Sequence, residues 1–171
     1  MNIGAIIMFT KEQLNEFLQE SNYIEQEYSS QAMEDSIKAW DFAYKNKDLI
    51  DINYILEIHR LLAINLRPDI AGKIRNCDVF IGGKRKIFID ETIIKSDLLM
   101  KVCFEMLARG IEDREEWTKQ IHVVFEEIHP FFDFNGRSGR LLWQIHRLNL
   151  GLPLHIIHEG EEQSAYYKWF Q

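Results

Sequence analysis

The spacing of apolar residues constrains this chain more than any other feature of its sequence. Apolar side chains recur every three or four positions, a pattern typical of amphipathic helices. Thr10 and Gln13 form a capping-box pattern, which predicts a first helix running through Leu14 and Phe17. The same spacing predicts further helices over residues 29–45, 51–65, 93–108, 115–128, 137–150 and 161–170. We therefore expect an all-α domain.

One segment departs from this spacing. Residues 79–81 and 87–89 are short runs of β-branched and aromatic residues, and they flank two glycines and three basic residues. Two such runs around a glycine-containing turn predict a β-hairpin. The basic residues Lys84, Arg85 and Lys86 would then form its exposed turn.

Composition excludes several classes of protein. The chain has 171 residues, the usual length of one compact domain. Its 20 Lys and Arg against 27 Asp and Glu give a net charge of −7, which argues against nucleic-acid binding because that needs a basic face. No stretch approaches the ~20 apolar residues of a membrane-spanning helix. The two cysteines, Cys77 and Cys103, are too few for a disulfide framework. We expect a cytoplasmic protein with no nucleic-acid or membrane partner.

The most informative stretch runs from His129 to Arg140 and joins two predicted helices. It places Arg137 and Arg140 in the first turn of the second helix, where free N–H groups and the helix dipole favour anions. Two guanidinium groups there suit phosphate oxygens. Asp133 supplies a hard oxygen ligand for Mg²⁺, and His129 offers a base that titrates near neutral pH. The alternative is that both arginines pair with acids such as Glu126, Glu127 and Glu161.

This stretch resembles the signature of the Fic family, which reads His-Pro-Phe-x-Asp/Glu-Gly-Asn-Gly/Lys-Arg-x-x-Arg. It departs from the fixed positions only at Phe134, where the signature has Gly. Residues 75–89, with Ile81-Gly82-Gly83, also resemble the family's flap hairpin. The resemblance implies a Fic-type helical bundle of about six to eight helices. It would comprise N-terminal helices over residues 1–48 and a catalytic core over 49–171, with a flap over 75–90.

Fic enzymes typically transfer AMP from ATP to a Ser, Thr or Tyr hydroxyl of a target protein and release pyrophosphate. By this resemblance, His129 would accept the proton of the target hydroxyl, and Asp133 would hold Mg²⁺. The other motif residues would bind the nucleotide: Asn135 the α-phosphate, Gly136 by close approach of the backbone, Arg137 and Arg140 the β- and γ-phosphates, and Gly139 beside them.

The resemblance also implies a protein partner. An extended segment of the target would add to the edge of the flap by main-chain hydrogen bonds. The docking residues would be Val79, Phe80, Ile81, Gly82 and Gly83. The alternative is a hairpin that only covers the site. Auto-modification and self-association are left open.

Many Fic proteins carry an inhibitory helix with the pattern Ser/Thr-x-x-x-Glu-Gly/Asn, whose Glu pairs with the second arginine of the signature. The run from Ser30 to Asp35 resembles this pattern and lies in the helix predicted over 29–45. Ser30 and Glu34 would then be regulatory. Glu34 on Arg140 would remove a phosphate ligand and place a like charge where the γ-phosphate belongs.

Two departures from the family patterns leave alternatives open. Phe134 would be strained, at a cost of about 1–3 kcal/mol, if its position requires a positive φ. Asp35 stands where the inhibitory pattern has Gly or Asn. We expect a protein adenylyltransferase restrained by Glu34. The alternatives are a Doc-like phosphotransferase or another nucleotidyl transfer, and a catalytically weakened Fic-fold binding module in which Phe134 reshapes the phosphate loop.

Overall fold

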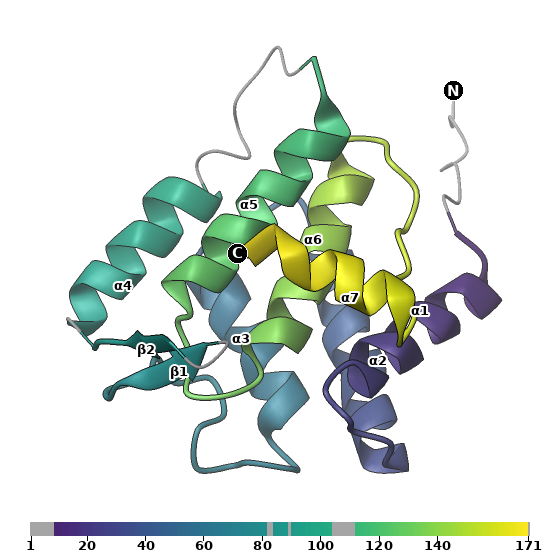
Figure 1. Ribbon diagram of the computed structural model, residues 1–171. Helices are drawn as coiled ribbons and strands as arrows, with labels where there is room; N and C mark the ends of the chain where they lie inside the picture. The colour runs from purple at the N-terminus through teal and green to yellow at the C-terminus, as the bar shows by residue number, and fades with distance from the viewer. Residues whose placement is uncertain (1–8, 82–83, 89, 104–111, 171) are drawn as a thin grey trace.

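The computed structural model of the protein describes residues 9–81, 84–88, 90–103 and 112–170. Within these ranges it confirms an all-α fold of seven α-helices with one two-stranded hairpin (Figure 1). The helices are α1 (Lys11–Tyr23), α2 (Ser30–Lys45), α3 (Ile52–Ala63), α4 (Glu91–Asp97), α5 (Arg114–Ile128), α6 (Asn135–Asn149) and α7 (Glu161–Tyr167). A π-helical segment, Leu98–Cys103, continues α4, and a 3-10 turn, Lys168–Phe170, follows α7. Residues 104–108 of the helix predicted over 93–108 lie outside the described part.

Helices α1 to α5 all begin at a capping side chain. The caps accept a backbone N–H of the first turn, and they are Thr10, Ser29, Asp51, Asp90 and Asp113. Helix α6 begins differently, because the residue before it is Phe134 and no side chain caps it. Its first N–H groups therefore have neither an intrahelical acceptor nor a cap, which leaves them available to an anion.

The second strand of the hairpin begins earlier in the sequence than predicted. Strand β1 (Val79–Ile81) pairs antiparallel with β2 (Lys84–Lys86), with Val79 opposite Lys86. The prediction that the second strand begins at residue 87, and that the basic residues form the turn, is therefore wrong, because Lys84–Lys86 form the strand and residues 87 and 88 do not; residue 89 lies outside the described part. A Gly-Gly pair between strands is the signal of a two-residue hairpin turn; Gly82 and Gly83 themselves lie outside the described residues.

Helix α6 is the central element of the fold and is buried on nearly every side. Helices α3 and α5 pack along it, with α1 and α2 at one end and the hairpin and α4 on the far side of α5 (Figure 1). The side chains that fill the core are large and fully buried, and they include Trp40, Ile58, Phe125, Phe131 and Ile145. This packing fixes the start of α6 and the loop that enters it. Within the described ranges, no helix combines the length and apolar character needed to cross a bilayer.

A second, smaller cluster joins the two ends of the described chain. Residues 158–170, here called the C-terminal clasp, lie across α6 and reach the end of α1 (Figure 1). His158 Nε2 lies 3.0 Å from Glu16 Oε1, and Gln163 Nε2 donates to the carbonyl of Ile24 at 3.2 Å. Tyr166 belongs to the same apolar cluster as Ile24 and Trp143. The clasp therefore holds the segment that follows α1 against the rest of the molecule.

Candidate active site

Two residues that flank the loop between α5 and α6 have a left-handed backbone conformation. His129, at the end of α5, has φ 49°, and Phe134, just before α6, has φ 63°. Left-handed backbone is unfavourable for residues with a Cβ, so each position stores strain of about 1–3 kcal/mol. We expected Phe134 to be strained if its position requires a positive φ, and the position does require one. Strain of this kind persists only where the surroundings hold the loop in place.

Asn135 is one of the groups that hold it. Its Oδ1 accepts the N–H of Phe131 at 2.9 Å, and its Nδ2 donates to the carbonyl of the same residue at 2.9 Å. The side chain thus closes a small ring inside the loop and is 3% exposed. Contact between Asn135 and the α-phosphate remains a prediction, and the structure gives this amide a loop-closing role that the sequence reasoning missed.

His59 supports the loop from α3. Its Nδ1 accepts the N–H of Gly72 at 2.9 Å, and its Nε2 lies 3.1 Å from the carbonyl oxygen of Asp133. An N–H can only donate and a carbonyl can only accept, so the ring is neutral, with its proton on Nε2. Burial favours this form by lowering the pKa of His59 to about 4. The ring also stacks on Phe131, with centroids 3.8 Å apart. In the sequence, His59 lies among the apolar residues of a helix, and nothing in that pattern predicts that it supports the loop.

Arg75 joins the base of the hairpin to the same loop. Its Nε donates to the carbonyl of His129 at 2.8 Å, and its backbone N–H donates to the carbonyl of Pro130 at 2.9 Å. The side chain is 4% exposed, and a further donor reaches the carbonyl of Cys77. A buried guanidinium thus fixes the position of the hairpin relative to His129.

The ring of Phe134 folds into the core instead of across the start of α6. It is 4% exposed, lies at right angles to the ring of His59 in a T-shaped pair, and lies under the guanidinium of Arg137 at 3.7 Å from ring centroid to Cζ. A cation over an aromatic face at that distance is attractive. The residue that departs from the Fic signature therefore stabilises one of the two signature arginines.

His129 is partly buried and electrically neutral. Its Nδ1 lies 3.3 Å from the carbonyl oxygen of Glu126, one turn earlier on α5, and its side chain is 16% exposed. Burial, reinforced by the positive charges of Arg75 and Lys86, lowers the pKa of His129 to about 4. At neutral pH the imidazole is therefore uncharged, and its second nitrogen, Nε2, is able to accept a proton.

Asp133 lies at the rim of the loop, and half of its side chain is exposed. Its Oδ1 accepts the N–H of Phe134 at 2.6 Å, and its Oδ2 lies 3.9 Å from Arg67 Nη1. Among the described residues, no three His, Cys, Asp or Glu side chains are grouped to hold a metal ion. One accessible carboxylate nevertheless fits Mg²⁺, which takes one or two carboxylates and completes its coordination with phosphates and water.

The first two turns of α6 carry the two arginines predicted to hold phosphates. Arg137 is 9% exposed, and its Nε has no partner among the described residues. Gly136 lies beside them, and a Cβ there would overlap the carboxylate of Glu25 and approach Arg140 Nη1. Uncapped N–H groups, two guanidinium groups and a glycine that permits close approach are together the features that suit an anion.

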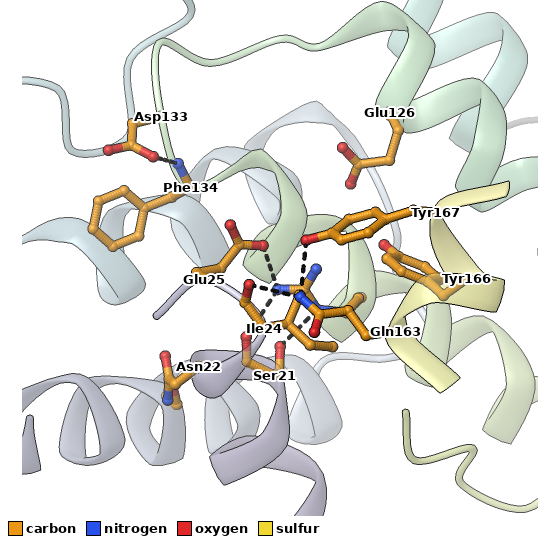
Figure 2. A network of polar contacts seen from close by, with 12 residues as sticks. Ser21, Asn22, Ile24, Glu25, Glu126, Asp133, Phe134, Gln163, Tyr166 and Tyr167 are labelled. Atoms are coloured by element: carbon orange, nitrogen blue, oxygen red, sulfur yellow. Dashed lines mark hydrogen bonds and ion pairs between the residues drawn. The ribbon is translucent and has the colours of Figure 1, made fainter. Parts of the chain in front are cut away.

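Arg140 is already paired with an acid, but not with the predicted one. Its Nη2 donates to Glu25 Oε1 at 2.7 Å and to the carbonyl of Ser21 at 2.8 Å, and its Nε donates to Ser21 Oγ at 3.0 Å (Figure 2). Burial alone would raise the pKa of Glu25, but the charge and hydrogen bond of Arg140, with help from Arg137 and His129, lower it overall. The prediction that Glu34 pairs with Arg140 is wrong.

Helix ends explain this correction. Ser21 to Gln26 also has Ser and Glu at the inhibitory spacing, and Glu25 follows the last turn of α1, which ends beside α6. Gln26 has φ 57°, the conformation that Gly or Asn favours, so the final residue of the family pattern marks a helix end. Ser30 begins α2, and the exposed Glu34 lies in its second turn. A search for the pattern at a helix C-terminus would have found Glu25.

The sequence profile of the Fic/DOC family matches residues 49–146, more than half of the chain. The chain belongs to the Fic/DOC family. It is 32% identical over 118 residues to a protein named protein adenylyltransferase fic-1 from Caenorhabditis briggsae. It is 30% identical over 129 residues to a protein adenylyltransferase Fic from Aedes aegypti. The alignments cover 69% and 72% of this chain but 23% and 24% of the relatives, so the chain spans about a quarter of their length.

Solved Fic structures share the fold. A Fic domain containing signaling protein from Bacteroides thetaiotaomicron superposes with a TM-score of 0.74 at 21% identity, over 90% of this chain and 69% of that one. Fic-1 from Caenorhabditis elegans superposes with a TM-score of 0.71 at 22% identity, over 92% of this chain and 54% of that one. The helical bundle with one hairpin, expected from the resemblance, is thus confirmed as a Fic fold.

Proposed function

We propose that this Fic domain is a protein adenylyltransferase that transfers AMP from Mg-ATP to a hydroxyl of a target protein. The observation that carries the proposal is the contact between Glu25 and Arg140 at the uncapped start of α6. A carboxylate is bound there by a guanidinium and lies against Gly136, as a phosphate group of a nucleotide would be. The printed names of the sequence relatives support the same reaction.

The residues of the loop divide the reaction between them. His129 is neutral at pH 7 and would accept the proton of the target hydroxyl as it attacks the α-phosphorus. Arg137, Arg140 and the free N–H groups of α6 would hold the phosphates and stabilise the charge that develops on pyrophosphate. Asp133 would hold Mg²⁺, which neutralises phosphate charge when it is bound.

The target would dock along the hairpin. Phe80 and Ile87 are 71% and 60% exposed, so the hairpin presents apolar side chains to a partner. Val79 is buried and anchors the hairpin instead, so of the predicted docking residues it would contribute only its backbone. A cavity of 370 Å³, lined in part by Lys86, Ile87 and Ile93, adjoins the hairpin and could take a side chain of the target.

Glu25 would keep the enzyme inactive. As a carboxylate paired with Arg140, it occupies a guanidinium that would otherwise bind a phosphate. Its negative charge also repels the phosphate that would replace it. About a third of its side chain (34%) is exposed, so the pair lies at the mouth of the site, where a ligand could displace it.

Incubation with ATP radiolabelled at the α-phosphate tests this proposal. Glu25→Ala should label itself or proteins of a cell extract more strongly than the unmodified chain does, and adding His129→Ala should abolish the label. Label from γ-labelled ATP instead would show a Doc-like phosphotransferase. Absence of label, together with no Mg-ATP-dependent rise in the unfolding temperature, would show a binding module and contradict the proposal.

A further inference from the structure

A second carboxyl group, that of Glu126, lies beside His129 in the candidate site, and the roles described so far do not use it. Glu126 is on α5, one turn before His129, and its side chain is 12% exposed. Its Oε1 is buried and has no hydrogen-bond partner among the described residues, and its Oε2 lies 3.9 Å from His129 Nδ1. Buried polar atoms are almost always hydrogen-bonded, so an exception at a ligand site indicates a group that the ligand completes.

The backbone of α6 makes room for this carboxyl group. Gly136 and Gly139 are three residues apart and therefore neighbours on one side of the helix. A Cβ on Gly136 would overlap the carboxylate of Glu25, and a Cβ on Gly139 would overlap Oε1 of Glu126. The two carboxyl groups thus lie against successive turns of the same helix start, and they enter from different elements (Figure 2).

Charged and titratable groups from several elements lie near Glu126. Arg140 on α6 attracts its anion, whereas Glu25, from the segment after α1, repels it. Tyr166 approaches from α7, and His122 and His129 lie on its own helix. Burial, with the added repulsion of Glu25, raises the pKa of Glu126 to about 8 despite Arg140. At neutral pH the group is mostly a neutral acid with a proton to donate.

We infer that Glu126 is a nucleotide-binding residue, which donates a hydrogen bond to a phosphate oxygen as a neutral acid and repels the nucleotide as a carboxylate. Binding of ATP to the open site then moves one proton from solvent onto a Glu126 carboxylate oxygen wherever that group starts ionised. This inference rests on the proposed nucleotide site. It adds a second control, in which Glu25 blocks the site by pairing with Arg140 and Glu126 makes the unblocked site sensitive to pH.

Removal of Glu25 should expose this second control. Without the repulsion of Glu25, the pKa of Glu126 falls, because an anion beside Arg140 becomes more favourable. Glu126 is then the carboxylate left facing Arg140. The variant freed of Glu25 should therefore bind ATP best below the pKa of Glu126 and progressively less well above it.

Calorimetric titration of Mg-ATP into Glu25→Ala, in two buffers of different ionisation enthalpy, tests the inference. We expect proton uptake on binding, and a Kd that rises by up to about tenfold per pH unit between about pH 7.5 and 9. Glu25→Ala/Glu126→Gln should take up no such proton and should show a nearly constant Kd. Glu25→Ala/Glu127→Gln is the matched control, since Glu127 is the exposed neighbour on α5, and it should behave like Glu25→Ala.

The outcomes separate this inference from the proposed function. Proton-coupled ATP binding without any protein labelling would overturn the function and keep the inference, whereas labelling with equal proton uptake in the Glu126→Gln protein would overturn the inference alone. Should Glu126→Gln unfold, carbon NMR of the Glu126 carboxyl in Glu25→Ala replaces it. The titration midpoint of that carboxyl should rise when Mg-ATP is added, and an unchanged midpoint would overturn the inference.

Discussion

Two segments of this chain carry a serine and a glutamate at the same spacing, yet only one reaches the site. Ser21 and Glu25 both contact Arg140, at the junction between the end of α1 and the start of α6. Ser30 and Glu34 lie in the first two turns of α2 and are exposed. The comparison teaches that the spacing alone does not define an inhibitory motif. What differs is position, because Glu25 follows the end of a helix that lies beside Arg140 and Glu34 does not.

Replacing the arginine itself should have the largest effect. Arg140→Ala removes the group on which the difference between the two segments depends, and it leaves Ser21 and Glu25 without their donor. We expect the free energy of unfolding to fall by about 2–3 kcal/mol, less than for a fully enclosed pair, because Glu25 is partly hydrated. Urea denaturation measures this loss. The same variant should also give no protein labelling from ATP radiolabelled at the α-phosphate. Arg67→Ala, at an exposed arginine paired with Asp69, should change stability by less than about 0.5 kcal/mol.

Replacing each glutamate by alanine tests the comparison directly. Glu25→Ala should tighten Mg-ATP binding by about tenfold or more, because a hydrogen bond between charged groups contributes about 1.5–3 kcal/mol and must be broken before phosphate binds. Glu34→Ala should leave the affinity unchanged. Equilibrium titration of both variants decides the matter, and equal affinities would contradict the role assigned to Glu25.

Replacing each serine by alanine should have a smaller effect than replacing the arginine or the glutamates. Ser21→Ala leaves the buried Nε of Arg140 without an acceptor and should lower the free energy of unfolding by about 1–2 kcal/mol. It should also loosen Glu25 and raise labelling a few-fold. Ser30→Ala, at an exposed position, should stay within about 0.5 kcal/mol. Thermal unfolding followed by circular dichroism compares the pair, and a similar loss in both would place Ser21 outside the network.

Replacing the residue after each glutamate by glycine should have the smallest effect, a change in stability of opposite sign at the two positions. Gln26→Gly relieves a left-handed backbone and should stabilise the chain by up to about 1 kcal/mol. Asp35→Gly should destabilise it, because Asp35 is fully buried in α2 and accepts a hydrogen bond from Asn65 at 2.7 Å. Opposite signs in urea denaturation would confirm that only the first segment ends a helix.

The sequence predicted what depends on neighbouring residues. Helical spacing located the helices, because burial of one face follows the local period. The stretch from His129 to Arg140 identified the family and the candidate site, since its residues lie within a few turns of one another in the sequence. The hairpin was found, but its register was wrong, because the basic residues after Gly83 look like a turn when strand pairing is unknown.

Residues that act at a distance were missed. His59 and Arg75 support the loop by bonds to the carbonyls of Asp133 and His129, and no pattern of side chains reports a backbone acceptor elsewhere in the chain. Glu25 required knowledge of where α1 points. Glu126 was considered only as a partner for an arginine, and its burial against Gly139 appears only once α5 and α6 are packed together.

The C-terminal clasp has a consequence for the order of folding. Its bonds join residues that lie more than a hundred positions apart in the sequence, such as His158 to Glu16 and Gln163 to Ile24. Contacts between residues far apart in sequence close large loops, and they form late because loop closure costs entropy before any contact compensates for it. The pairing of α5 with α6, by contrast, joins neighbouring segments. We expect the loop between α5 and α6 to form first and Glu25 to reach Arg140 only afterwards. Under the proposed inhibition by Glu25, a newly made molecule would therefore pass through a brief, uninhibited state.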